Sequence, residues 1–115
     1  MGYLLKKRRS RRISVDLEAE LISYNTRYSA FIENISEHSI CAKIAHHKTT
    51  EEFKRKPRVY LKLRLPSGHV IHLNGKTIWS DKNTPHSLIG HIAVEIVNPP
   101  QEYTLFYRAM SHNQN

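Results

Sequence analysis

The chain has 115 residues, 39% of them hydrophobic and 24% charged, which predicts one folded domain and excludes a disordered chain. The formal net charge of +8 is uneven, because residues 6–12 supply six cations without an acid and the rest carries only +2. Such a basic segment favours phosphates, nucleic acid or an acidic membrane surface. The sequence contains no secretory signal or long apolar run, and Cys41 is its only cysteine, so we expect a cytoplasmic protein without a membrane span or internal disulfide.

Short alternations of apolar and polar residues recur along the chain and predict half-buried antiparallel strands. In the first of them, aliphatic residues alternate with Asp16, Glu18 and Glu20. Turns are expected at residues 25–27 and 66–69 from their composition. In chain order, the predicted strands cover residues 15–21, 28–35, 40–44, 59–65, 70–80 and 88–97.

Other segments interrupt or end this pattern. Gly75 lies inside a predicted strand and indicates a bulge or a close approach of two backbones. Residues 46–56 are polar and show no strand pattern, whereas Pro100 suits the first position of a helix predicted at residues 101–111. The predicted fold class is all-β: a small antiparallel barrel with this helix over one opening. A flexible basic arm at residues 1–12 precedes the single barrel domain at residues 13–115.

Two polar signatures are candidates for binding. In the first, Arg8 and Arg12 carry planar guanidinium groups that match phosphate with two donors and stack on bases. On a flexible arm they would close over a nucleotide; the alternative is a solvated basic tail. In the second, Asn34 and Ser36 would form a polar lip that contacts a base or phosphate. The alternative there is an ordinary loop between two strands.

The order of the two signatures resembles the PilZ domain family. That family has an R-x-x-x-R motif in an N-terminal arm and a [D/N]-x-S-x-x-G motif on the barrel. Residues 8–12 match the first motif in full, and residues 34–39 match the second except that Ser39 replaces the glycine. Residues 75–79 are similar to the family's G-x-V-x-W strand, and residues 89–94 are similar to its closing strand.

The resemblance implies a six-stranded antiparallel barrel that binds cyclic di-GMP and controls bacterial motility, adhesion or exopolysaccharide. Arg8 and Arg12 would grip guanines and phosphates, and Asn34, Ser36 and Ser39 would contact the ligand from the barrel. If the motif's glycine serves a left-handed conformation, Ser39 would cost about 1 kcal/mol and weaken binding without abolishing it. Candidates for additional contacts are Lys7, which would help to neutralise a second ligand molecule, and Arg9.

Three hypotheses about the function of the protein follow from these observations. The leading one is a receptor that orders its arm around cyclic di-GMP and signals through a partner protein, with no catalytic role and no cofactor. The second is a degenerate family member that acts only in protein interaction, a reading that Ser39 favours. The third is a basic barrel that binds nucleic acid, which is disfavoured because the predicted strands show no cluster of exposed aromatics among basic residues. The histidines lack metal-ligand spacing, so no metal site is predicted.

Overall fold

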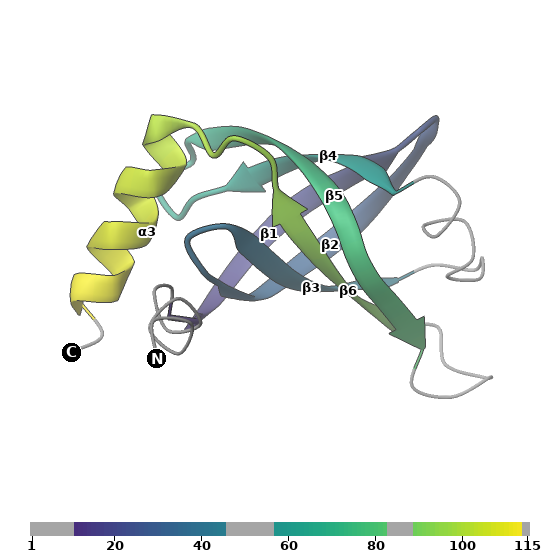
Figure 1. Ribbon diagram of the computed structural model, residues 1–115, viewed down its shortest axis with the longest axis horizontal. Coiled ribbons are helices and arrows are strands. Elements are labelled where there is room, and N and C mark those ends of the chain that lie inside the picture. Colours follow the sequence, from purple (N-terminus) through teal and green to yellow (C-terminus); the bar gives the residue numbers. More distant parts are fainter. Residues whose placement is uncertain (1–10, 46–56, 83–88, 114–115) are drawn as a thin grey trace, which may run out of the picture.

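The computed structural model describes residues 11–45, 57–82 and 89–113 (Figure 1). Within these ranges six antiparallel strands close into a barrel and a helix follows, which confirms the predicted fold class. The rest of the arm, including Lys7, Arg8 and Arg9, and the polar stretch at 46–56 lie outside them. The elements are β1 (Ile13–Ser23), β2 (Thr26–Ile35), β3 (Ser39–Ala45), β4 (Arg58–Arg64), β5 (Val70–Lys82), β6 (Ile89–Ile96) and α3 (Gln101–Asn113).

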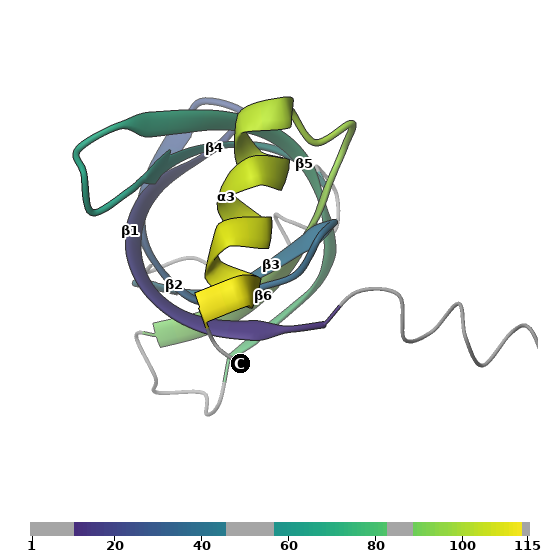
Figure 2. The same ribbon diagram turned by 90° about the vertical axis from the view of Figure 1, so that its left-hand side faces the viewer.

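The strands follow one another around the barrel in the order β1-β2-β3-β6-β5-β4, and β4 pairs with β1 to close it. Helix α3 lies across the opening at which β1 begins and β2 joins β3 (Figure 2). It ends two residues later than expected, at Asn113. No helix within the described ranges is long and apolar enough to cross a membrane.

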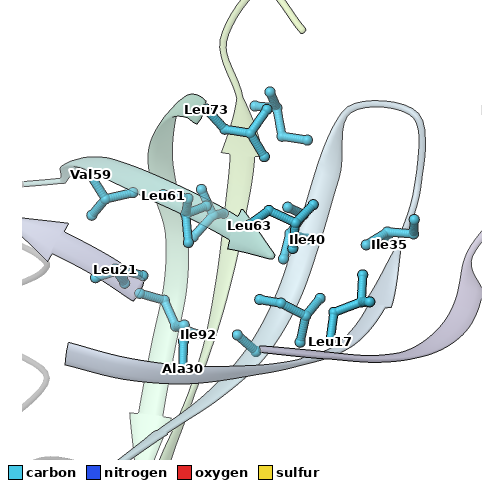
Figure 3. Packing of buried hydrophobic residues seen from close by; sticks show 14 of the residues in the cluster. Leu17, Leu21, Ala30, Ile35, Ile40, Val59, Leu61, Leu63, Leu73 and Ile92 are labelled. Atoms are coloured by element: carbon cyan, nitrogen blue, oxygen red, sulfur yellow. The ribbon is translucent and has the colours of Figure 1, made fainter. Parts of the chain in front are cut away.

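The core fills the barrel with aliphatic side chains from every strand (Figure 3). Because a closed sheet has no edge, each strand turns alternate residues inward, and this produces the period of two seen in the sequence. Leu21, Leu63 and Leu73 are fully buried. Tyr103 from α3 is fully buried as well and belongs to the same core cluster, so the helix is part of the core.

The turn between β1 and β2 differs from the expectation. It is a two-residue loop of Tyr24 and Asn25, flanked by the pair Ser23 and Thr26, so the turn predicted at residues 25–27 began one residue too late and ended two residues too late. Tyr24 adopts a φ of 58°, a left-handed conformation that hairpin loops of this length require. Composition pointed to Asn25, because asparagine accepts this conformation more readily than tyrosine.

Gly75 marks a close approach rather than a bulge. A Cβ atom at this position would collide with Cγ1 of Val94 and lie 3.1 Å from the carbonyl oxygen of Glu95. The register shift between β5 and β6 falls further along, between Thr77 and Trp79. Glycine is therefore needed at this position because β6 leaves no room for a side chain.

The barrel surface separates its charges by strand. The outward side chains described on β4 and β5 include cations and no acid, whereas the charged side chains described on the other strands are five acids and two cations, Arg27 and Lys43. The nearly balanced charge behind the arm therefore divides into a basic wall and an acidic wall. The described cations of the basic wall are Arg58, Lys62, Arg64 and Lys76, and the described acids of the other strands are Asp16, Glu18, Glu20, Glu33 and Glu95.

Candidate functional site

The second signature, residues 34–39, forms a lip at the barrel end that α3 covers. The backbone N–H of Ser36 donates to the carbonyl oxygen of Ser39 at 2.8 Å, which closes the turn between β2 and β3. The N–H of Ile96 donates to the carbonyl oxygen of His38 at 2.7 Å and ties the turn to β6. The turn is thus closed by one backbone hydrogen bond and attached to β6 by a second one, so the lip has a defined conformation.

Asn34 lies where the sheet is irregular on both sides. The β2–β3 register shifts between Ile32 and Asn34, and the β1–β2 register shifts between Ser14 and Leu17. Such bulges re-aim side chains and are frequent beside binding sites. Asn34 is only half-buried, so part of this residue is accessible from solvent at this point of the lip.

Ser36 and Ser39 interact directly. Their hydroxyl oxygens lie 2.6 Å apart and share a hydrogen bond, and Ser36 is buried. Among the described non-glycine residues, only Tyr24 and Asn98 have a positive φ. Ser39 is therefore not in the left-handed conformation for which a free-energy cost of its side chain was considered. The serine in place of the motif's glycine instead gives the hydroxyl of Ser36 a hydrogen-bond partner.

The strand register brings Arg12 to the lip. Ile13 pairs with Ile35 across β1 and β2, so Arg12, one residue earlier, comes beside Ser36, one residue later. The Arg12 side chain is exposed. The structure therefore gathers Arg12, Asn34, Ser36 and Ser39 at one end of the barrel. These residues come from two separate parts of the chain, and all four were predicted to contact one ligand together with Arg8.

Helix α3 contacts the lip at Ser36 and the chain at Arg11, the residue before Arg12. The sequence did not predict these contacts. The Tyr103 hydroxyl donates to the carbonyl oxygen of Ser36 at 2.6 Å. The Tyr107 hydroxyl donates to the carbonyl oxygen of Arg11 at 2.6 Å and accepts from its N–H at 3.1 Å. The available signal was the spacing of four residues, which puts two tyrosines on one helix face. A buried tyrosine also needs a hydrogen-bond partner for its hydroxyl.

The Tyr103 hydroxyl remains a donor over a wide pH range. Burial, and to a lesser degree the charge of a Tyr107 phenolate, raises the pKa of Tyr103 above its ordinary value of 10.0. Deprotonation would leave a buried phenolate facing the carbonyl oxygen of Ser36. The lip is therefore attached to the helix by a hydrogen bond that neutral and moderately alkaline solutions do not disturb.

We expect this tyrosine to make folding stability fall in strong alkali. Because the folded-state pKa is raised, its contribution is complete below about pH 10 and is lost as the pH rises through the folded value, at up to about 1.4 kcal/mol per pH unit. Urea unfolding between pH 9 and pH 11.5 measures the slope. Tyr103→Phe should flatten it, and a slope equal to that of the wild type in this variant would contradict the assignment.

Comparison with known proteins identifies the family. A family model for the PilZ domain matches residues 6–107. The chain belongs to the PilZ domain family. Both signatures of this PilZ domain, residues 8–12 and 34–39, fall inside the matched range, which confirms the resemblance seen in the sequence. A search of curated proteins found no match.

Two solved structures share the fold of this PilZ domain. The inhibitor of motility MotI/DgrA of Bacillus subtilis is 17% identical, with a TM-score of 0.71 over 93% of this chain and 51% of its own. PlzA of Borreliella burgdorferi, solved in complex with c-di-GMP, is 14% identical, with a TM-score of 0.69 over 99% of this chain and 56% of its own. The PilZ domain thus spans about half the length of either protein. Among the described residues, no three His, Cys, Asp or Glu side chains gather as metal ligands.

Proposed function

We propose that this PilZ domain is a receptor for cyclic di-GMP. The observation that carries the proposal is the register of β1 and β2, which puts Arg12 beside the lip of Asn34, Ser36 and Ser39. Arg12 is exposed, and Arg8 completes the R-x-x-x-R motif in the sequence. The c-di-GMP complex of PlzA, which shares the barrel fold, supports this choice of ligand.

The side chains divide the recognition between them. The guanidinium groups of Arg8 and Arg12 would pair with the phosphates and stack on the guanines. The amide of Asn34 would read a base edge, and the hydroxyl of Ser36 would bond to the ligand when Ser39 releases it. Lys7 and Arg9 would add positive charge next to these groups. No step of this recognition makes or breaks a covalent bond, so the proposed role is binding and not catalysis.

The signal would pass to a partner protein through the arm. Ordering of the basic arm around two phosphates would change both the shape and the charge of this end of the barrel, and a partner can detect such a change.

The cytoplasm is the proposed site of action. Cys41 is the only cysteine of the sequence, which agrees with a reducing compartment.

Isothermal titration calorimetry with cyclic di-GMP tests the proposal. We expect saturable binding to the full chain and much weaker binding of the linear dinucleotide pGpG, which cannot present both phosphates in the same ring. The stoichiometry separates one ligand per chain from the dimer for which Lys7 is a candidate. Absence of heat and of any chemical-shift change at high micromolar ligand would refute the receptor and favour the protein-interaction module.

Replacing Ser39 with glycine is expected to tighten binding by roughly three- to tenfold, the value of one hydrogen bond. The change removes the hydroxyl that occupies Ser36 at 2.6 Å. Glycine at the first position of β3 should also lower folding stability by about 0.5–1 kcal/mol. Calorimetry of Ser39→Gly and Ser39→Ala separates the hydroxyl from the Cβ, because alanine removes only the former. Unchanged affinity in both variants would show that the hydroxyl of Ser36 does not contact the ligand.

One observation favours nucleic acid as a second candidate ligand. The rings of Tyr60 and His72 stack with centroids 5.7 Å apart on the wall that also carries Arg58, Lys62 and Lys76. This pair of a half-buried tyrosine and an exposed histidine lies among cations, and it is the observation that favours this candidate. A single-stranded oligonucleotide should then bind with a steep salt dependence and lose affinity in Tyr60→Ala. Binding of cyclic di-GMP without oligonucleotide binding would dismiss this candidate.

A further inference from the structure

One face of helix α3 contacts both parts of the candidate site. Tyr103, Tyr107 and Ser111 are spaced by four residues and lie on the same side of the helix. The first holds the lip at Ser36, and the other two hold Arg11 at the root of the arm. The helix therefore contacts both the lip and the residue before β1, which the pairing of β1 with β2 already brings close together.

Arg11 is held by the helix through its backbone and its side chain. Tyr107 occupies both the N–H and the carbonyl oxygen of this residue. The guanidinium Nη2 atom donates to the carbonyl oxygen of Ser111 at 3.1 Å and to its hydroxyl at 3.3 Å. Because Arg12 is the next residue, these bonds restrict the backbone that carries its exposed guanidinium. A binding group restricted in this way loses less conformational entropy when the ligand arrives.

The two ends of the helix are anchored differently. In the first turn, Glu102 accepts a hydrogen bond from His69 of the β4–β5 hairpin at 2.8 Å, and Tyr103 is buried in the core. In the last turn, Ser111 accepts hydrogen bonds from the Arg11 side chain, and His112 is exposed. A change at the arm root therefore acts on the last turns of the helix and leaves the first turn in place.

We propose that Tyr107, Ser111 and Arg11 are positioning residues that couple occupation of the nucleotide site to docking of the last two turns of helix α3. The inference rests on the proposed function, because it assigns regulation to the same site. Coupling is reciprocal: if the docked helix end improves nucleotide binding, the bound nucleotide stabilises the docked helix end by the same factor. Docking of the last turns of α3 would therefore differ between the free and the nucleotide-bound protein, and a partner that contacts these turns can distinguish the two states.

Two measurements on the full chain test the coupling. Tyr107→Phe, which keeps the ring and removes one hydroxyl, should bind cyclic di-GMP roughly three- to tenfold more weakly. In the wild-type protein, saturating cyclic di-GMP should slow amide hydrogen exchange in residues 107–113 and leave residues 101–104 unchanged. In Tyr107→Phe and in Arg11→Ala this ligand-dependent slowing should be lost.

The matched control is Tyr24→Phe. It also removes a tyrosine hydroxyl, but at the exposed β1–β2 hairpin, at the end of these strands opposite to Arg11 and the lip. We expect wild-type affinity and wild-type exchange in this variant. The coupling is refuted if Tyr107→Phe binds cyclic di-GMP as well as the wild type does and the ligand does not change amide hydrogen exchange in α3. The proposed receptor function is not affected by that outcome. If the wild type does not bind, the proposed function itself fails, and the inference fails with it.

Discussion

Replacement of Arg12 by alanine is expected to weaken binding of cyclic di-GMP by about ten- to a hundredfold, because a hydrogen bond to a charged group contributes about 1.5–3 kcal/mol. Arg12 is the one arginine of the R-x-x-x-R motif whose position relative to the lip is defined, next to Ser36 by the pairing of Ile13 with Ile35. Its exposed side chain has little role in the core, so the folding stability of the variant should stay close to that of the wild type.

Two matched variants separate the geometry of the group from its charge. Arg12→Lys keeps the positive charge and loses the planar fork, so its affinity should lie between those of wild type and Arg12→Ala. Arg27→Ala removes the same charge from the opposite end of β1 and β2, where Arg27 pairs with Glu20 at 3.4 Å, and should bind as the wild type does. Calorimetry at one salt concentration measures all of them.

The double variant Arg8→Ala with Arg12→Ala gives the limiting case. We expect no binding at micromolar ligand, because both guanidinium groups of the motif are then missing. An affinity equal to that of the wild type would refute the role assigned to the arm. If Arg27→Ala weakened binding as much as Arg12→Ala, the effect of the arm would be one of net charge, and the proposed contact between Arg12 and the ligand would be wrong.

Replacement of Gly75 by alanine is expected to destabilise the fold by roughly 2–3 kcal/mol, the cost of overpacking a filled core. The new Cβ would overlap Cγ1 of Val94, a buried side chain, and approach the carbonyl oxygen of Glu95 to 3.1 Å. Relief would require β5 and β6 to move apart, which stretches the ladder of hydrogen bonds that joins them. Urea unfolding followed by circular dichroism measures the change.

Gly68 provides the control for this substitution. It has a φ of 94° and no atom within 4 Å of an added Cβ, so Gly68→Ala tests backbone conformation without a steric clash. We expect a loss of about 1 kcal/mol for Gly68→Ala. A larger loss for Gly68→Ala than for Gly75→Ala would contradict the packing argument at Gly75. Cyclic di-GMP affinity should change little in either variant under conditions in which both remain folded.

The sequence by itself determined the barrel, its closing helix and the family. Strands with one face toward a core repeat every two residues, and this pattern needs only local information, so the predicted strands match β1 to β6 within a few residues. The motifs at residues 8–12 and 34–39 are short and contiguous, and they lie inside the range that the family model matches. The placement of Tyr24 at the hairpin was missed, because there the closure of the hairpin outweighed the preference of a single residue.

Only the tertiary structure decided how the parts of the site meet. The position of Arg12 beside Ser36 depends on the pairing register of two strands, which composition does not encode. The hydrogen bond between the hydroxyls of Ser36 and Ser39 depends on how tightly the turn folds, and it replaces the backbone strain that a lost glycine suggested. Tyr103 and Tyr107 acquire their roles because α3 crosses the end of the barrel at which the lip and the arm root lie. Apart from the local bond between Ser36 and Ser39, these contacts join residues distant in the chain, and such contacts exist only once the barrel has closed.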